Sequence, residues 1–286
     1  MTGYVPQSSA RRGFAEHFDG RDVGGFVHEE PEVAVSGDSV TVRVASVHPT
    51  ECNHAVRNAV ARGARHVFVR GANGQRFIAA GLEGADVEVE IEGVPGNDLA
   101  MLLDGPTVRV HGDAQDGVGN TMGSGTVVVE GRAGDVLGYA MRGGTILVRG
   151  DIGCRAGINM KEYGDEDPTI VVGGTARDFL GEYMAGGVIV VLGARGSAPG
   201  ALVGDFLGAG MCAGSVYLRA RAQDVVSDGV DRLEVADVDA ASEPALVDAV
   251  GRFARAFGDD ERVLLDHPFC RVRPRKASSA PIYAGL

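Results

Sequence analysis

The chain has 286 residues and a formal net charge of −12. Hydrophobic residues make up 44% and charged residues 23%, which is typical of a soluble globular protein and excludes a disordered chain or a coiled coil. The acidic balance argues against nucleic acid or an anionic membrane as the main partner. No apolar run reaches the ~18 residues that cross a bilayer, and the first residues lack a signal-peptide core, so we expect a cytoplasmic protein.

The reactive residue types do not form a recognisable catalytic pattern. The four cysteines, Cys52, Cys154, Cys212 and Cys270, contain no CxxC pair and no histidine at metal-ligand spacing, so neither a zinc site nor an iron–sulfur cluster is predicted. Walker, GxSxG and HExxH patterns are absent from the sequence. We therefore expect no catalytic, cofactor or metal site in this chain.

The first third of the chain predicts a flexible segment, a helix and one irregular strand. Residues 1–35, with Arg11 and Arg12 among many glycines, are expected to be flexible until bound. A capping helix is predicted from Thr50, as its N-cap, to Arg62, with Gly63 as its stop. The run HVFVRG at residues 66–71 predicts a less regular strand after that helix.

Seven short β-branched runs then follow at nearly constant spacing. They begin at residues 88, 107, 126, 145, 169, 188 and 215, so four of the six intervals are 19 residues and the other two are 24 and 27. In the run from Thr107, Val108 and Val110 alternate with Arg109 and His111, as in a strand with one buried face, and apolar residues recur at the same two positions of the other runs. A unit of this length cannot close a core alone, whereas stacked units can. The pattern predicts an all-β, parallel β-helix of about seven coils, and disfavours a β-propeller, whose blades need about 40 residues.

A glycine and a methionine recur at one phase of this repeat. The glycine stands seven residues before four of the runs and the methionine three residues after the glycine; a fifth copy precedes an insertion. Such glycines predict corners with positive φ, and methionine fills irregular core gaps more readily than it forms a cofactor site. These structural repeat positions are Gly119, Gly138, Gly157, Gly181 and Gly208, with Met122, Met141, Met160, Met184 and Met211.

The two longer intervals place insertions at residues 161–168 and 194–200. Insertions in solenoids project as loops from one face, often the binding face, although the acidic first insertion is also compatible with a solvated loop. The candidate partner interface comprises Lys161, Glu162, Tyr163, Glu182, Tyr183 and Arg195.

After the last run, Ser242 is predicted to cap a second helix that ends at Phe257, before Gly258. Its apolar residues fall on one helical face, and residues 265–286 are expected to form an extended tail laid on the column or on a partner. These expectations divide the chain into a flexible segment (1–35), a β-helix domain (36–222) and a C-terminal helix with its tail (223–286).

Three long stretches carry a family resemblance. They are GDAQDGVG at residues 112–119, DFLGEYMAGGVIVVLG at 178–193 and ALVGDFLGAGM at 201–211. Over roughly residues 50–220 the chain resembles the C-terminal GXGXG domain of the glutamate synthase large subunit. In that family the domain is a right-handed β-helix to which no catalytic residue is ascribed. It is a scaffold between an amidotransferase domain, which releases ammonia from glutamine, and an FMN- and iron–sulfur-binding domain.

As a separate chain, the domain resembles the third subunit of split glutamate synthase-like enzymes such as N-methylglutamate synthase. The resemblance implies a non-catalytic scaffold without a cofactor, whose partners are a class II glutamine amidotransferase subunit and an FMN- and iron–sulfur-bearing synthase subunit. A more distant similarity, to the formylmethanofuran dehydrogenase subunit that has similar coils, implies a formyl-transferring complex instead. A self-contained enzyme with an unrecognised site and a homomeric assembly protein are further alternatives.

Overall fold

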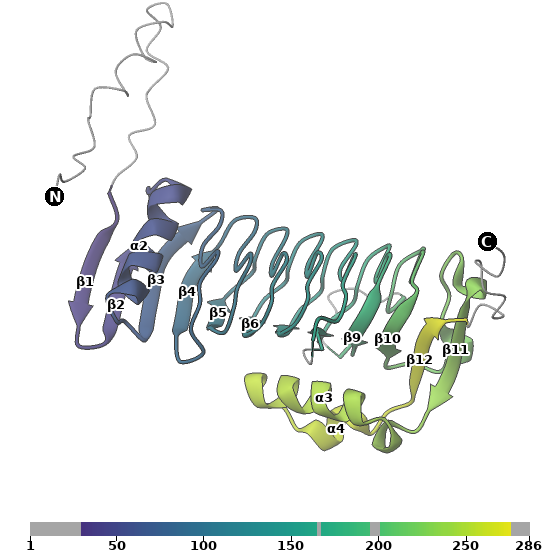
Figure 1. Ribbon diagram of the computed structural model, residues 1–286. Helices are drawn as coiled ribbons and strands as arrows, with labels where there is room; N and C mark the ends of the chain where they lie inside the picture. Colours follow the sequence, from purple (N-terminus) through teal and green to yellow (C-terminus); the bar gives the residue numbers. More distant parts are fainter. Residues whose placement is uncertain (1–29, 165–166, 195–200, 276–286) are drawn as a thin grey trace, which may run out of the picture.

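The computed structural model describes residues 30–164, 167–194 and 201–275, and its strands form one 12-stranded sheet. Nine consecutive strands, β2 to β10, pair in parallel and stack along a column (Figure 1). Their bounds are β2 Ser39–Arg43, β3 His66–Asn73, β4 Glu88–Val94, β5 Thr107–His111, β6 Thr126–Val129, β7 Thr145–Val148, β8 Thr169–Val172, β9 Ala185–Val191 and β10 Ala213–Leu218. The parallel β-helix is confirmed: the seven predicted runs are β4 to β10, which bound six turns, and the irregular earlier run is β3.

The inward side chains of the strands form continuous apolar columns. Val89 pairs with Val108 and Val108 with Val127, and the column continues in register through Ile146, Ile170 and Ile189. All six side chains are fully buried. Burying one such side chain stabilises a fold by about 1.5–3 kcal/mol, so the repeated β-branched runs account for the pairing register.

A hairpin and a helix form the first end of the column. Strand β1 (Glu32–Ser36) pairs antiparallel with β2, and helix α2 (Pro49–Ala61) buries Cys52, Val56 and Ala59. The predicted N-cap was wrong: Pro49 occupies the first turn, so His48 caps the helix and its side chain accepts the Thr50 N–H. The predicted stop is confirmed, since Gly63 has φ +99°.

The sheet continues at the other end with two antiparallel strands. Strand β12 (Phe269–Pro274) pairs with β10, and β11 (Leu233–Val238) pairs with β12. Part of the predicted tail is therefore a strand laid on the column, and the sheet extends into the segment that we separated as residues 223–286. Short 3-10 helices lie nearby at η2 Ala222–Asp224, η3 Val230–Arg232 and η4 Ala240–Ser242.

Helix α3 (Pro244–Phe257) and the short helix α4 (Glu261–Leu265) lie along the outer face of the sheet rather than across the end of the column (Figure 1). The outer face is apolar on the later coils, where α3 buries Phe253 against it. Glu243, not Ser242, precedes the helix, because Pro244 begins the first turn. The Glu243 carboxylate makes no cap and accepts hydrogen bonds from Tyr217 and Arg271 instead. Gly258, at φ +69°, ends the helix as predicted.

Residues 1–29, most of the predicted flexible segment, lie outside the described residues. The remainder of that segment forms β1. Within the described ranges, every helix is too short or too polar to cross a membrane.

Candidate partner-binding surface

The repeated glycines form one corner of five successive coils, a position that Ala79 and Ala100 occupy in the earlier coils. Gly138 has φ +65°, and Val136 and Ala140, two residues to either side, also have positive φ. The Val136 and Ala140 N–H groups donate to the following coil, at Cys154 and Ile158, while the Gly138 N–H donates to the preceding coil. The corner is thus a second ladder of backbone hydrogen bonds, which satisfies its polar groups. The five repeat glycines all have φ between 59° and 69°.

The repeat methionines pack inside this corner. Four of them have no exposed surface and Met211 is 7% exposed. A Cβ added at Gly144 would lie 2.6 Å from the Met122 methyl carbon, and one at Gly214 would lie 2.6 Å from that of Met184. The methionine of one coil therefore occupies the space left open in the next coil by a second glycine, which stands six residues after the repeat glycine.

Outward side chains of the corner form an aromatic ridge across three coils. The Arg155 guanidinium carbon lies 4.6 Å from the Phe179 ring centroid, and Phe179 stacks on Phe206 with centroids 4.7 Å apart. We call Arg155, Phe179 and Phe206 the aromatic ridge. Phe206 is 43% exposed. Aromatic and arginine side chains held rigidly at a surface are the residue types that dominate protein–protein interfaces.

Two predicted interface residues adjoin the ridge. The Glu182 carboxylate lies 2.9 Å from Arg155 Nε, and its side chain is only 12% exposed, so Glu182 orients the arginine instead of facing outward. Tyr183 is 57% exposed and its ring lies over Gly210 of the next coil. The structure therefore brings Glu182 and Tyr183 together with the ridge.

The three predicted interface residues of the first insertion are exposed, and one of them, Glu162, is also anchored. Lys161 and Tyr163 are exposed. The Glu162 carboxylate accepts the Gly187 N–H at 2.8 Å, which ties the insertion to the next coil. Residues 165–166 and Arg195 lie outside the described residues, so Arg195 has no assigned place at this surface.

Sequence reasoning missed the ridge itself. Its residues stand two positions before the repeated glycine, in a column that reads Gly117, Val136, Arg155, Phe179 and Phe206. Aligning the copies at the glycine would have shown large side chains gathering in the later coils. The ridge also needs a positive φ at each residue, from 59° to 62°, which only the stacked corner enforces.

Acidic side chains beside the corner accept hydrogen bonds from backbone N–H groups of the next coil. Asp116 Oδ1 accepts the Asp135 N–H at 2.9 Å, and Asp135 Oδ1 accepts the Cys154 N–H at 2.8 Å. A groove of about 570 Å³ runs beside this ladder, where the N–H and guanidinium of Arg132 lower the pKa of Asp113. The carboxylates of Asp116 and Asp135 thus satisfy backbone N–H groups of the next coil.

The two buried thiols are not activated, and the described residues contain no metal-ligating cluster. Burial raises the pKa of Cys52 to about 12 and that of Cys270 to about 11, which keeps both as unreactive thiols near neutral pH. In the same part of the chain, no group of three or more histidine, cysteine, aspartate or glutamate side chains is arranged to hold a metal ion.

His111 bridges three coils on the polar part of the outer sheet face. Its Nε2 lies 2.9 Å from Glu90 and its Nδ1 3.3 Å from Glu130. The hydrogen bond to Glu90, and then the pairing with Glu130, raise its pKa above the ordinary 6.5. Protonated His111 therefore stabilises the fold below about pH 6.5, and this contribution is lost as pH rises through the raised value.

We expect the free energy of unfolding of the wild type to fall over that pH window relative to His111→Gln, because glutamine cannot become charged. Urea unfolding at a series of pH values measures the difference between the two proteins. Parallel pH profiles would show that the bridge carries no charge-dependent stability. Glu90→Gln, which removes the first partner, should reduce the same difference.

The model of the GXGXG motif family matches residues 37–271 of this chain. The chain belongs to the GXGXG motif family. This GXGXG protein is 36% identical over 242 residues to the uncharacterized protein MJ1350 of Methanocaldococcus jannaschii, covering 83% of this chain and 93% of that one.

A solved structure shares the fold at lower identity. It is the formyltransferase/hydrolase complex FhcABCD from Methylorubrum extorquens with methylofuran, matched with a TM-score of 0.52 and 20% identity over 73% of each chain. At that identity the likeness concerns the fold alone.

Proposed function

We propose that this GXGXG protein is a non-catalytic scaffold subunit of a multi-subunit, glutamate synthase-type enzyme complex. The aromatic ridge carries the proposal: Arg155, Phe179 and Phe206 form an exposed stack on a rigid corner. Beside it, the carboxylates of Asp116 and Asp135 accept backbone N–H groups of the next coil, which is a structural role. A surface of this kind binds protein better than it performs chemistry.

The partners that we propose are a class II glutamine amidotransferase subunit and a synthase subunit that carries FMN and iron–sulfur clusters. Membership of the GXGXG family and the motif stretches at residues 112–119 and 178–193 support this choice. The chain itself is proposed to hold no cofactor and to act in the cytoplasm. N-methylglutamate synthase is the specific form of the complex that we propose.

A second candidate is a scaffold in a formyl-transferring complex. The observation that favours it is the shared fold with a chain of the Methylorubrum extorquens formyltransferase/hydrolase complex. Its partners would be of formyltransferase or hydrolase character and would bring no flavin.

The identity of the partners is tested by affinity purification of the tagged full chain from its native source, with mass spectrometry and an absorption spectrum of the eluate. Flavin and iron–sulfur absorption together with an amidotransferase chain is the result expected. A colourless eluate with a formyltransferase or hydrolase chain would replace the first proposal by the second. Turnover by the purified single chain would overturn the scaffold role.

The aromatic ridge also predicts how strongly single substitutions change partner binding. We expect Phe206→Ala to weaken partner binding by about 30-fold, the equivalent of a 2 kcal/mol hot spot. The matched control is Phe77→Ala: Phe77 has a positive φ at the same corner and an arginine, Arg76, 5.0 Å above its ring, but it lies on an early coil. Equal binding by both variants and wild type, measured by titration of the purified partner, would exclude the ridge as the interface.

A further inference from the structure

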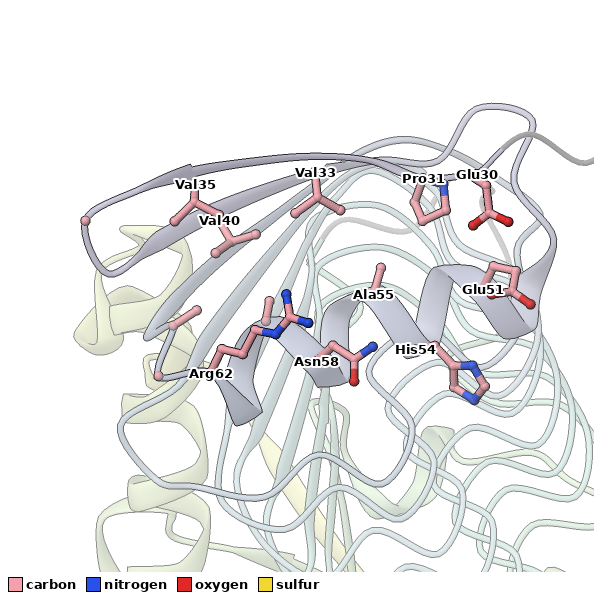
Figure 2. Close-up of a pocket in the computed structure, with 14 residues that line it drawn as sticks. Glu30, Pro31, Val33, Val35, Val40, Glu51, His54, Ala55, Asn58 and Arg62 are labelled. Carbon is pink, nitrogen blue, oxygen red and sulfur yellow. The ribbon is translucent and has the colours of Figure 1, made fainter. Parts of the chain in front are cut away.

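The first end of the column is apolar beyond its cap. Val33 and Val35 of β1 pair in register with Val42 and Val40 of β2, which continue the inward columns of the solenoid. The two β2 valines are buried, whereas Val33 is 48% and Val35 is 72% exposed. Figure 2 shows the β1 valines above α2, where they line a groove of about 400 Å³. The inward apolar columns therefore extend to β1, one strand beyond the strands β2 and β3 that α2 contacts.

The two edges of the sheet differ in how they are protected. All five residues of β1 are exposed, and its outer edge has no strand partner within the described ranges. Its one charged residue, Glu32, pairs with Arg43 of β2, and the other four residues are uncharged. At the opposite edge, β11 carries Asp237, whose carboxylate accepts the Ala222 N–H, and Glu234, which pairs with Arg273. Charged and locally bonded edges resist further pairing, and flat apolar edges attract it. The β1 edge is therefore the edge of the sheet that favours pairing with a further strand.

We infer that a second copy of this chain covers the groove, in a two-fold dimer with β1 of one copy antiparallel to β1 of the other. Glu30 lies at one end of the groove and Arg62 at the opposite end (Figure 2). Neither side chain has an ion-pair partner among the described residues. A two-fold axis through Ala34 places Glu30 of each copy at the end where the second copy's Arg62 lies, and Val33 across from the second copy's Val35. The groove is thus complementary to itself.

The spacing of the two helices agrees with this pairing. In the dimer, three strand spacings of ~4.8 Å separate the two copies of β2, so the α2 helices that cover them lie roughly 14 Å apart on the same face. That is wider than the ~8–10 Å of direct helix packing. The long side chains of His54 and Arg62, which line the groove, fill the difference and cover the valines.

The molar mass of the full chain in solution tests the dimer. We expect twice the chain mass of 29.6 kDa for the wild type, and 29.6 kDa for Val33→Glu/Val35→Glu. Both valines lie outside the buried core, and circular dichroism confirms that the variant is folded. The matched control is Val263→Glu on α4, a valine 61% exposed elsewhere, which should remain dimeric.

A charge exchange distinguishes a second copy from any other occupant. Glu30→Arg and Arg62→Glu alone should each raise the dimer dissociation constant at least about tenfold, and the double variant should restore it, because a two-fold interface re-forms both pairs. A wild type of 29.6 kDa at every concentration, or a double variant weaker than both single ones, would overturn the inference. A monomer that still captures its partner chains would leave the scaffold proposal standing.

Discussion

Replacing Gly138 by alanine is expected to lower the free energy of unfolding by about 3 kcal/mol. The residue has φ +65°, and a left-handed conformation costs an ordinary residue about 1–2 kcal/mol. A Cβ there would also lie 2.6 Å from the Ile170 Cδ1 atom, and overpacking of this kind costs about 1–3 kcal/mol. Urea unfolding of the two proteins measures the loss.

Gly181→Ala is the matched control, since Gly181 stands at the same corner position with φ +69° but its Cβ would meet no atom closer than 3.6 Å. Only the backbone term applies, so we expect a loss of about 1–2 kcal/mol. Equal losses at both positions would show that Ile170 moves aside without cost. If neither variant is less stable than wild type, the corner does not require glycine.

Phe253→Ala is expected to cost about 3–5 kcal/mol, as for a large side chain removed from a core. Phe253 is fully buried between α3 and the outer sheet face, and its ring lies against Gly173, where a Cβ would approach its Cζ to 2.7 Å. Hydrogen exchange should accelerate in α3 and the urea midpoint should fall.

The control for this change is Val263→Ala, a side chain 61% exposed on the neighbouring helix α4, for which we expect a loss within about 0.5 kcal/mol. An unchanged midpoint and unchanged exchange for Phe253→Ala would mean that α3 contributes no stability to the column.

The repeat could be predicted because its causes are local. Strands β4 to β10 follow from β-branched runs at a spacing that lets each side chain meet its copy one coil away. The repeat methionines follow from the same spacing, because the Met122 methyl fills the place where Gly144, six residues after the repeat glycine Gly138, has no side chain. Strands β1, β2 and β11 were missed, since they lie outside the regular intervals.

Helix caps were predicted from residue type and were wrong where proline intervened. Thr50 and Ser242 are good caps, but Pro49 and Pro244 begin their helices one residue before Thr50 and two residues after Ser242. The place of α3 could not be read from its own pattern. An amphipathic helix specifies an apolar face and not its target, and the target here is the outward column Val128, Leu147, Val171 and Val190.

The sequence by itself determined the parallel β-helix, its family and the buried or corner position of the repeat residues, because a periodic chain places equivalent residues in equivalent surroundings. Only the tertiary structure decided which surfaces remain open. The stack of Arg155, Phe179 and Phe206 joins residues from three coils, and the groove under Val33 and Val35 exists because α2 stops one strand short of the sheet edge. Both depend on distances between separate coils and elements, which no single stretch of sequence encodes.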